Sequence, residues 1–373
     1  MKAWLERLLG KSTHTPAAAS PAPSPAAPQS EGLLVNAYAT VCVLPPLDFD
    51  HQLLAQRDAG DPALAPHLEG FVQHVLSRGD GEMTARRYGL MRHIERVQQQ
   101  VSLVVSEAAW PSYLGWAQRA NALSFLPDAS ILDTQGRELL NAAGQATDPE
   151  AALPSLPDAL ARKARSEAVL QAHGLRSPAS LPPVLAEAEL QPRTPEEIAA
   201  RAVAVLAAAV RAESLASEQA LSSNEILARL PDAAAAWSPQ ERDFMQAPAP
   251  EAQLVANMGW RYECVAVFAW ALGLQQTLPF PDSICDVGPL TRRFLDAGSS
   301  QALLAQAQPR SASELLDALD ETFRLHWCIR DAQVKQQPAP DGLLPGVVLE
   351  RHRALNWLVR FAHADWDDVD MPT

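Results

Sequence analysis

The pattern of apolar and polar positions divides the chain into a part with strands and helices and a part with helices alone. Up to residue 140, short β-rich runs alternate with segments in which apolar residues recur every three or four positions, as in amphipathic helices. Strands are predicted over 33–43 and 101–106, and helices over 64–76, 83–99 and 110–120. Thr134-Gln135-Gly136-Arg137 lies between two short apolar runs, which predicts a hairpin over 131–140.

Beyond residue 150 the strand pattern disappears and helix starts are well marked. Thr194-Pro195-Glu196-Glu197 combines an N-cap, a proline at the first helical position and a capping-box glutamate, and Ser238-Pro239-Gln240-Glu241 repeats this arrangement. Helices are predicted over 194–214, 251–273, 312–336 and 346–362. The predicted fold class is therefore α+β, with a small α/β domain at 33–149 followed by an all-α helical domain at 150–373.

The first 32 residues belong to neither domain. Residues 2–9 predict a short amphipathic helix, which would either touch a membrane surface or a partner, or fray as a free terminus. Glu6 and Arg7 interrupt its apolar stretch, so this is not a secretory signal. Residues 12–32 alternate Ala, Pro and Ser, a composition that builds no core and is typical of a disordered linker.

The charge balance excludes several classes of partner. The 373 residues include 30 Lys+Arg and 44 Asp+Glu, which gives a net charge of −14. Nucleic-acid binding needs clustered basic residues, so it is not expected, whereas a basic protein would suit this chain. No run of ~18 apolar residues is present, so we expect no stable membrane insertion. The four cysteines are far apart and form no C-x-x-C motif, which favours a reducing cytoplasm and neither a disulfide scaffold nor a zinc site.

Three C-terminal helical patterns place ionisable residues on the stripes that should pack. Glu263 shares a stripe with Trp260 and Trp270. Asp320 lies on a second stripe of apolar residues, and Arg351 lies on a third one near the C-terminus. A lone buried charge costs several kcal/mol, so each should find a partner across a helix interface. The simplest interpretation is a structural pairing of Glu263 or Asp320 with a base. Arg351 is the first choice as partner of Glu263, and Arg330 is the second.

A second interpretation is a polar pocket in the helical domain. There Glu263, Asp320 and His326 would be the candidate catalytic residues, exchanging protons with a ligand. No motif for a metal or a cofactor is present, so neither is expected. The full candidate cluster, whether it binds a ligand or is structural, is Arg261, Glu263, Asp320, Arg324, His326, Arg330, Glu350 and Arg351.

The chain ends in an acidic segment, Asp365-Trp366-Asp367-Asp368-Val369-Asp370. A calcium loop would need alternating oxygen ligands and a glycine turn, and that glycine is missing. We expect Trp366 to pack into the helical domain while the acids face water or meet helix N-termini, where negative charge is favoured.

These segments also resemble a known family. The resemblance is carried by Trp260-Arg261-Tyr262-Glu263, Trp270-Ala271-Leu272-Gly273, Cys285-Asp286-Val287, Asp320 with Arg324-Leu325-His326-Trp327, Glu350 to Leu358, and Trp366-Asp367-Asp368-Val369. Over roughly 175–373 the chain resembles a bacterial family catalogued as domain of unknown function 4272. The Asp-Thr usual at the end of that pattern is Pro372-Thr373 here. The resemblance implies no activity, cofactor or catalytic residue.

Together these features favour a non-enzymatic protein that binds a partner or a ligand, with the α/β domain as a second recognition module. The alternative is an enzyme with hydrolase-like acid/base chemistry that uses Glu263, Asp320 and His326 in a pocket. An open pocket lined by these three side chains would favour the enzyme, and their complete pairing in a dry interface would favour the structural interpretation.

Overall fold

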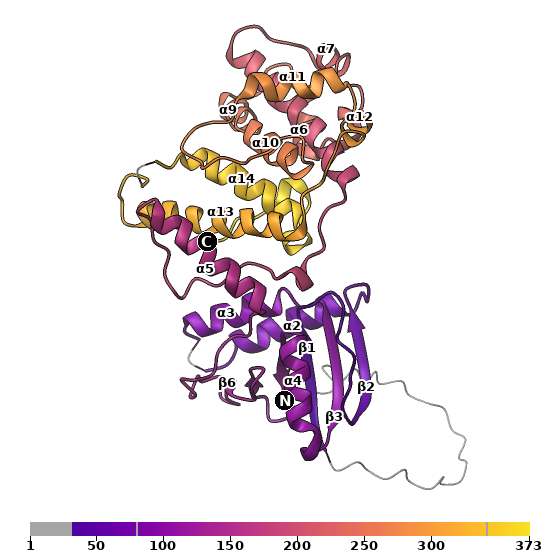
Figure 1. Ribbon diagram of the computed structural model, residues 1–373, viewed down its shortest axis with the longest axis vertical. Coiled ribbons are helices and arrows are strands. Elements are labelled where there is room, and N and C mark those ends of the chain that lie inside the picture. Colours follow the sequence, from indigo (N-terminus) through magenta and orange to yellow (C-terminus); the bar gives the residue numbers. More distant parts are fainter. Residues whose placement is uncertain (1–31, 80, 341) are drawn as a thin grey trace, which may run out of the picture. The chain divides into compact units, whose positions relative to one another are not determined.

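Strand β1 forms the centre of an antiparallel sheet in the N-terminal part of the chain. The computed structural model describes residues 32–79, 81–340 and 342–373. Six strands lie in the order β2-β3-β1-β4-β5-β6, and all neighbours are antiparallel. Their bounds are β1 Leu33–Ala39, β2 His51–Asp58, β3 Gln99–Val105, β4 Ala122–Phe125, β5 Ile131–Leu132 and β6 Glu138–Leu140. Figure 1 shows β2 at one edge of this sheet.

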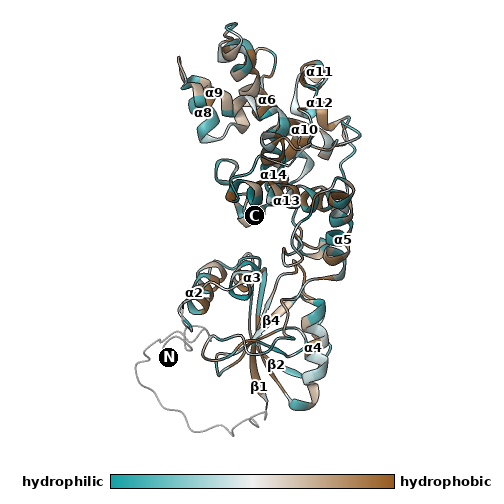
Figure 2. Ribbon diagram, turned by 90° about the vertical axis from the view of Figure 1, so that its left-hand side faces the viewer, coloured by the Kyte–Doolittle hydropathy of each residue, from teal (hydrophilic) through white to brown (hydrophobic). Residues whose placement is uncertain are grey.

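The sheet has helices on both faces because its central strands alternate buried side chains. Helices α2 (Leu64–Leu76) and α3 (Ala85–Ile94) cover the face that carries Tyr38, and α4 (Trp110–Arg119) covers the face that carries Ala37. Figure 2 shows α2 and α3 on one side of the strands and α4 on the other. This part of the chain is the small α/β domain that the sequence predicts.

Two strands of the sheet were not predicted. Strand β2 is an edge strand whose Leu53 and Leu54 are 48% and 49% exposed, so its sequence lacks the alternation of a half-buried strand. Strand β4 spans only four residues, too few for a periodicity. The predicted helix over 83–99 is also shorter, because α3 ends at Ile94 and β3 begins at Gln99.

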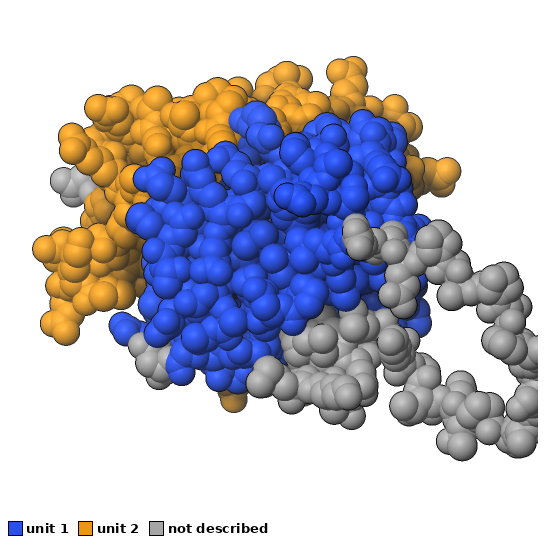
Figure 3. Space-filling model, turned by 90° about the horizontal axis from the view of Figure 1, so that it is seen from below, with its two compact units in different colours: residues 1–157 blue, residues 158–373 orange. Residues whose placement is uncertain are grey.

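The chain divides into two compact units, with the second beginning at Asp158 (Figure 3). In residues 158–340 and 342–373 the structure has helices and no β-strand, so the predicted α+β class is confirmed. The helices are α5 Pro157–Ala172, α6 Pro195–Ala216, α7 Ser223–Leu227, α8 Pro239–Gln246, α9 Ala252–Gly259, α10 Tyr262–Ala271, α11 Val287–Ala297, α12 Ser300–Leu304, α13 Ala312–Val334 and α14 Pro345–Leu358.

Helix α6 is the central element of the second unit. It begins at the predicted capping box, where the Thr194 hydroxyl accepts from the Glu197 backbone N–H and the Glu197 carboxylate accepts from the Thr194 N–H. Its alanine-rich surface is buried on nearly every side and packs against α9, α10 and α12. Helices α13 and α14 pack against each other, and α14 also packs on α10.

Two predicted helices differ in the structure from the bounds predicted for them. The segment predicted as one helix over 251–273 forms two helices, because α9 ends at Gly259 and α10 begins at Tyr262. At this break Trp260 is 42% exposed instead of packed inside, and its ring lies against Gly346, where a Cβ atom would approach it to 2.9 Å. The pattern over 346–362 ends at Leu358, since Arg360 adopts a positive φ of 54° and the chain turns back there.

Candidate functional site

Glu263 of α10 and Arg351 of α14 form a buried ion pair. The Arg351 Nε donates to Glu263 Oε2 over 3.1 Å, and the two side chains are 3% and 2% exposed. The other oxygen, Oε1, accepts from the backbone N–H of Cys285 at 2.6 Å. The first-choice partner of Glu263 is therefore confirmed. The second choice, Arg330, is wrong as a partner, because it is exposed near the end of α13 and donates to Gln333.

Asp320 is paired within its own helix. Arg324, one turn further along α13, donates to both carboxylate oxygens of Asp320 at 2.8 and 3.0 Å, and neither side chain is exposed. Asp320 also accepts from the Val184 backbone N–H at 3.2 Å, and Arg324 donates to the Pro182 carbonyl at 3.1 Å. This pair therefore attaches the segment before α6 to α13. Its partner is neither Arg330 nor Arg351, since both oxygens are already occupied.

His326 contacts a second buried histidine rather than a carboxylate. Its Nδ1 lies 2.9 Å from Nδ1 of His352 on α14, so one ring donates and the other accepts. Burial lowers the pKa of His326 to about 4, and the nearby Arg330 adds to this effect. Burial likewise lowers the pKa of His352 to about 3. Both imidazoles are thus neutral at physiological pH.

The remaining members of the predicted cluster hold the C-terminal segment. Arg261 Nη1 donates to Glu350 Oε2 at 2.6 Å, and its guanidinium lies 5.6 Å from the ring centroid of Trp366. The guanidinium of Arg201, which is paired with Glu241, lies 5.2 Å from the same ring.

Trp366 is buried, as predicted, and packs on aromatic rings of α10 and α14. The next residue, Asp367, accepts from the Gln240 backbone N–H at the N-terminus of α8 over 2.9 Å. The acidic segment therefore packs onto the helical unit through the buried Trp366 and Val369 and the helix-end contact of Asp367, and Asn356 Nδ2 donates to the Asp370 carbonyl at 2.9 Å.

The structure does not bring the three candidate catalytic residues together. Glu263, Asp320 and His326 each have a separate partner in a buried interface. Burial raises the pKa of the Cys264, Cys285 and Cys328 thiols, that of Cys285 to about 12, which disfavours the thiolate form of these three. Among the described residues, no group of three His, Cys, Asp or Glu side chains could hold a metal ion.

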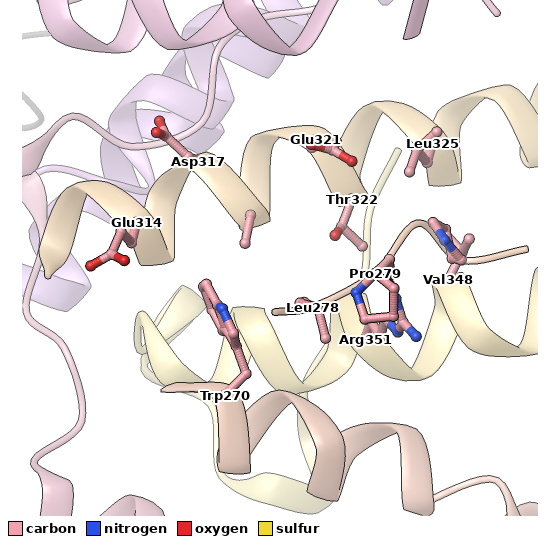
Figure 4. Close-up of a pocket in the computed structure, with 12 residues that line it drawn as sticks. Trp270, Leu278, Pro279, Glu314, Asp317, Glu321, Thr322, Leu325, Val348 and Arg351 are labelled. Atoms are coloured by element: carbon pink, nitrogen blue, oxygen red, sulfur yellow. Dashed lines mark hydrogen bonds between the residues drawn. The ribbon is translucent and has the colours of Figure 1, made fainter. Parts of the chain in front are cut away.

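A pocket of ≈ 280 Å³ lies between α10, α13, α14 and the segment that contains Leu278 and Pro279 (Figure 4). The lining residues of α13 are spaced by one to four positions and form one helix face: Glu314, Asp317, Ala318, Glu321, Thr322 and Leu325. Of the predicted cluster, only Arg351 lines the pocket, whereas Glu263, Asp320 and His326 do not.

Polar groups of this pocket differ in whether they already have partners. Glu314 caps α13 and pairs with Arg310, and Asp317 pairs with Arg162 and Arg165. By contrast, the described part of the chain provides no hydrogen bond or ion pair to Glu321, and none to the hydroxyl of Thr322. Burial raises the pKa of Glu321.

Sequence reasoning missed this face of α13 because it followed the stripe with Asp320 and Phe323, which carries the larger side chains. The spacing of Glu314, Asp317 and Glu321 was the available signal. It did not distinguish a solvated face from a pocket wall, because the other wall comes from the irregular segment around Pro279.

No helix in the described residues is long and apolar enough to cross a bilayer.

Comparisons with known proteins bear on the helical unit. Neither the curated proteins nor the solved structures include a match to this chain. Residues 162–369, more than half of the chain, match the family model described as Domain of unknown function (DUF4272). The chain therefore belongs to the DUF4272 family, and the matched residues include the buried pairs and Trp366.

Proposed function

We propose that this chain is a non-catalytic binding protein whose helical unit receives its ligand, or a side chain of a protein partner, in the pocket between α10, α13 and α14. One observation carries the proposal: the three candidate catalytic residues each have a partner in a buried interface, and none of them lines the pocket. Among the described lining residues, the Glu321 carboxyl is the one acid without a hydrogen bond or ion pair, and no second unpaired titratable group lies there to share its proton. General acid/base catalysis needs a titratable group within hydrogen-bond reach of the substrate. Glu263, Asp320 and His326 do not line the pocket.

The size of the pocket supports a small occupant. Small-molecule sites commonly measure about 300–1,000 Å³, so ≈ 280 Å³ suits one side chain or a compact molecule. Its walls combine apolar side chains, including Trp270 and Leu325, with a few polar groups that lack partners, a composition typical of binding pockets.

The charge of the chain supports a basic protein as the partner. A net charge of −14 would accelerate encounter with a positively charged surface and disfavour acidic competitors. The described cysteines form no disulfide with one another, in keeping with our proposal of a reducing, cytoplasmic location in a bacterial cell.

The proposal is tested with a pocket-blocked variant. Ala318 lines the pocket on α13, so Ala318→Phe should fill it, and Lys335→Met on the exposed end of the same helix serves as control. A fragment set is screened by ligand-observed NMR against the three proteins. We expect a class of fragments that binds the chain and the control but not the blocked variant.

Two results would overturn the proposal. In one, every fragment that binds the chain also binds Ala318→Phe. In the other, mass spectrometry detects chemical conversion of a bound fragment and Glu263→Gln abolishes it, which would establish the enzyme alternative.

A further inference from the structure

We infer that the pocket between α10, α13 and α14 binds a small zwitterion, with a carboxylate and an ammonium group on one compact apolar body, as in an α-amino acid. This inference rests on the proposed binding function and names the chemistry of the ligand.

The donors are on Arg351 and Thr322. Arg351 uses Nε for Glu263 and Nη1 for the Pro279 carbonyl, and its Nη2 donates to no other described residue. Thr322 is 7% exposed and its hydroxyl likewise has no described partner. Figure 4 shows Thr322 projecting from α13 into the space that Arg351 borders from α14. Both donor atoms are accessible from the pocket and have no partner among the described residues, so together they favour an acceptor such as a carboxylate.

The acceptor is Glu321, which precedes Thr322 on the same helix. Burial raises the pKa of this carboxyl, His173 counteracts the rise, and Asp317 and Asp320 add to it. The other two pocket acids, Glu314 and Asp317, already pair with arginines. Glu321 is thus the pocket carboxylate that lacks a counter-ion, and an ammonium group beside it would stabilise its ionised form.

Charge balance favours a zwitterion over a simple ion. Glu263 already neutralises Arg351, so a plain anion would place a second carboxylate on one guanidinium without compensation. A plain cation would satisfy Glu321 but would leave Nη2 of Arg351 and the Thr322 hydroxyl unpaired. A ligand that carries both charges satisfies both sides and leaves the net charge of the pocket unchanged.

The rest of the lining fits an apolar body. Seven apolar side chains surround the polar groups: Trp270, Leu278, Pro279, Pro281, Ala318, Leu325 and Val348. With ≈ 280 Å³ available, a branched aliphatic chain of a few carbons fills the pocket, whereas a larger peptide does not. Leucine therefore serves as the probe.

Three probes with the same aliphatic body separate the two charges. Leucine carries both, 4-methylpentanoate lacks the ammonium group, and 3-methylbutylamine lacks the carboxylate. Isothermal titration calorimetry on the full chain should give leucine an affinity at least about tenfold higher than either single-charge probe.

Variants then assign each charge to its residue. Glu321→Gln should weaken leucine about tenfold and leave 4-methylpentanoate unchanged, whereas Thr322→Val should weaken both of these and leave 3-methylbutylamine unchanged. The matched control is Asp331→Asn, the same acid-to-amide change on the same helix, at a carboxylate that is paired with Lys335 and does not line the pocket. It should bind leucine like the unmodified chain.

The inference fails if either single-charge probe binds as tightly as leucine, if none of the three binds, or if Glu321→Gln and Asp331→Asn have equal effects. In these cases the proposed binding function still stands, provided that another class of fragments binds the chain and the Lys335→Met control but not Ala318→Phe. If every fragment that binds the chain also binds Ala318→Phe, both proposals are overturned.

Discussion

Arg351 Nε lies 3.1 Å from Glu263 Oε2, and this pair connects α14 to α10 in an interface from which water is nearly excluded. The second oxygen of Glu263 accepts from the Cys285 N–H just before α11, so one carboxylate positions three segments. The same arginine borders the pocket. A change at Arg351 therefore affects both the packing of the helical unit and any ligand.

Removing the base alone should be strongly destabilising. Arg351→Met leaves Glu263 buried without a counter-ion, which costs ~3–5 kcal/mol of unfolding free energy by the usual behaviour of broken buried pairs. The double variant Glu263→Gln/Arg351→Met should recover much of this loss, since no charge is then buried. Urea unfolding of the two single variants and the double variant gives the coupling energy of the pair.

The control for this cycle is an exposed pair of the same charge type. Lys335 and Asp331 lie 2.6 Å apart with 57% and 29% of their side chains exposed, so Lys335→Met should cost less than ~1 kcal/mol. If Glu263→Gln and Arg351→Met are additive and each costs under ~0.5 kcal/mol, the pair does not stabilise this interface.

The Trp366 ring should contribute more to stability than its place near the chain end suggests. It is 5% exposed and packs between the Arg201 and Arg261 guanidiniums and against Phe268. Trp366→Ala removes this ring and leaves a cavity, which should cost ~3–5 kcal/mol. Thermal unfolding followed by circular dichroism measures the effect.

A second tryptophan provides the comparison. Trp260 is 42% exposed and lies on the surface of Gly346, so Trp260→Ala should cost clearly less than Trp366→Ala. Equal losses for the two variants would contradict the view that the C-terminal segment is fixed by a buried ring.

Local signals in the sequence predicted several features well. Helix α2 has the predicted bounds, Leu64–Leu76, and the capping boxes at Thr194 and Ser238 both start helices. The pairing of Glu263 with Arg351 was also predictable, because a carboxylate on a stripe of large apolar residues requires a base and Arg351 lies on a similar stripe.

Features that depend on tertiary contacts were not predictable. Asp320 lies on a packing stripe but pairs within its own helix, because Arg324 one turn away reaches both oxygens. Arg330 lies on the same stripe but is exposed, because near its end α13 buries the face of Ile329 and Ala332 while Val334 on the stripe is 78% exposed. The pocket itself depends on where the irregular segment around Pro279 lies, and no periodicity encodes that position.

The N-terminal 31 residues should be dispensable for folding. Their structure lies outside the described residues, so this prediction rests on their Ala/Pro/Ser composition. Deleting residues 1–31 should change the thermal midpoint by less than about 1 °C. A fall of several degrees would mean that the predicted helix at 2–9 packs on one of the units.

The His326–His352 contact should make the helical unit sensitive to acid. Burial lowers the pKa of these residues to about 4 and about 3 in the folded state, whereas both titrate near 6.5 when unfolded. Above pH 6.5 both states are neutral and the contact adds no pH dependence. As the pH falls from 6.5 towards 4, the unfolded chain binds protons that the folded chain does not, so the free energy of unfolding decreases.

Replacing one histidine tests this directly. For the fully buried His352, the free energy of unfolding falls by up to about 1.4 kcal/mol for each pH unit below 6.5. His352→Asn, whose amide does not titrate, should remove this contribution to the pH dependence of stability. The control is His363→Asn, because His363 is exposed. Urea unfolding at pH 7.5, 6.0 and 5.0 compares the three proteins, since buried histidines of the α/β unit contribute the same background to each. If His352→Asn and the unmodified chain lose stability at the same rate below pH 6.5, the two imidazoles are not held neutral by the fold.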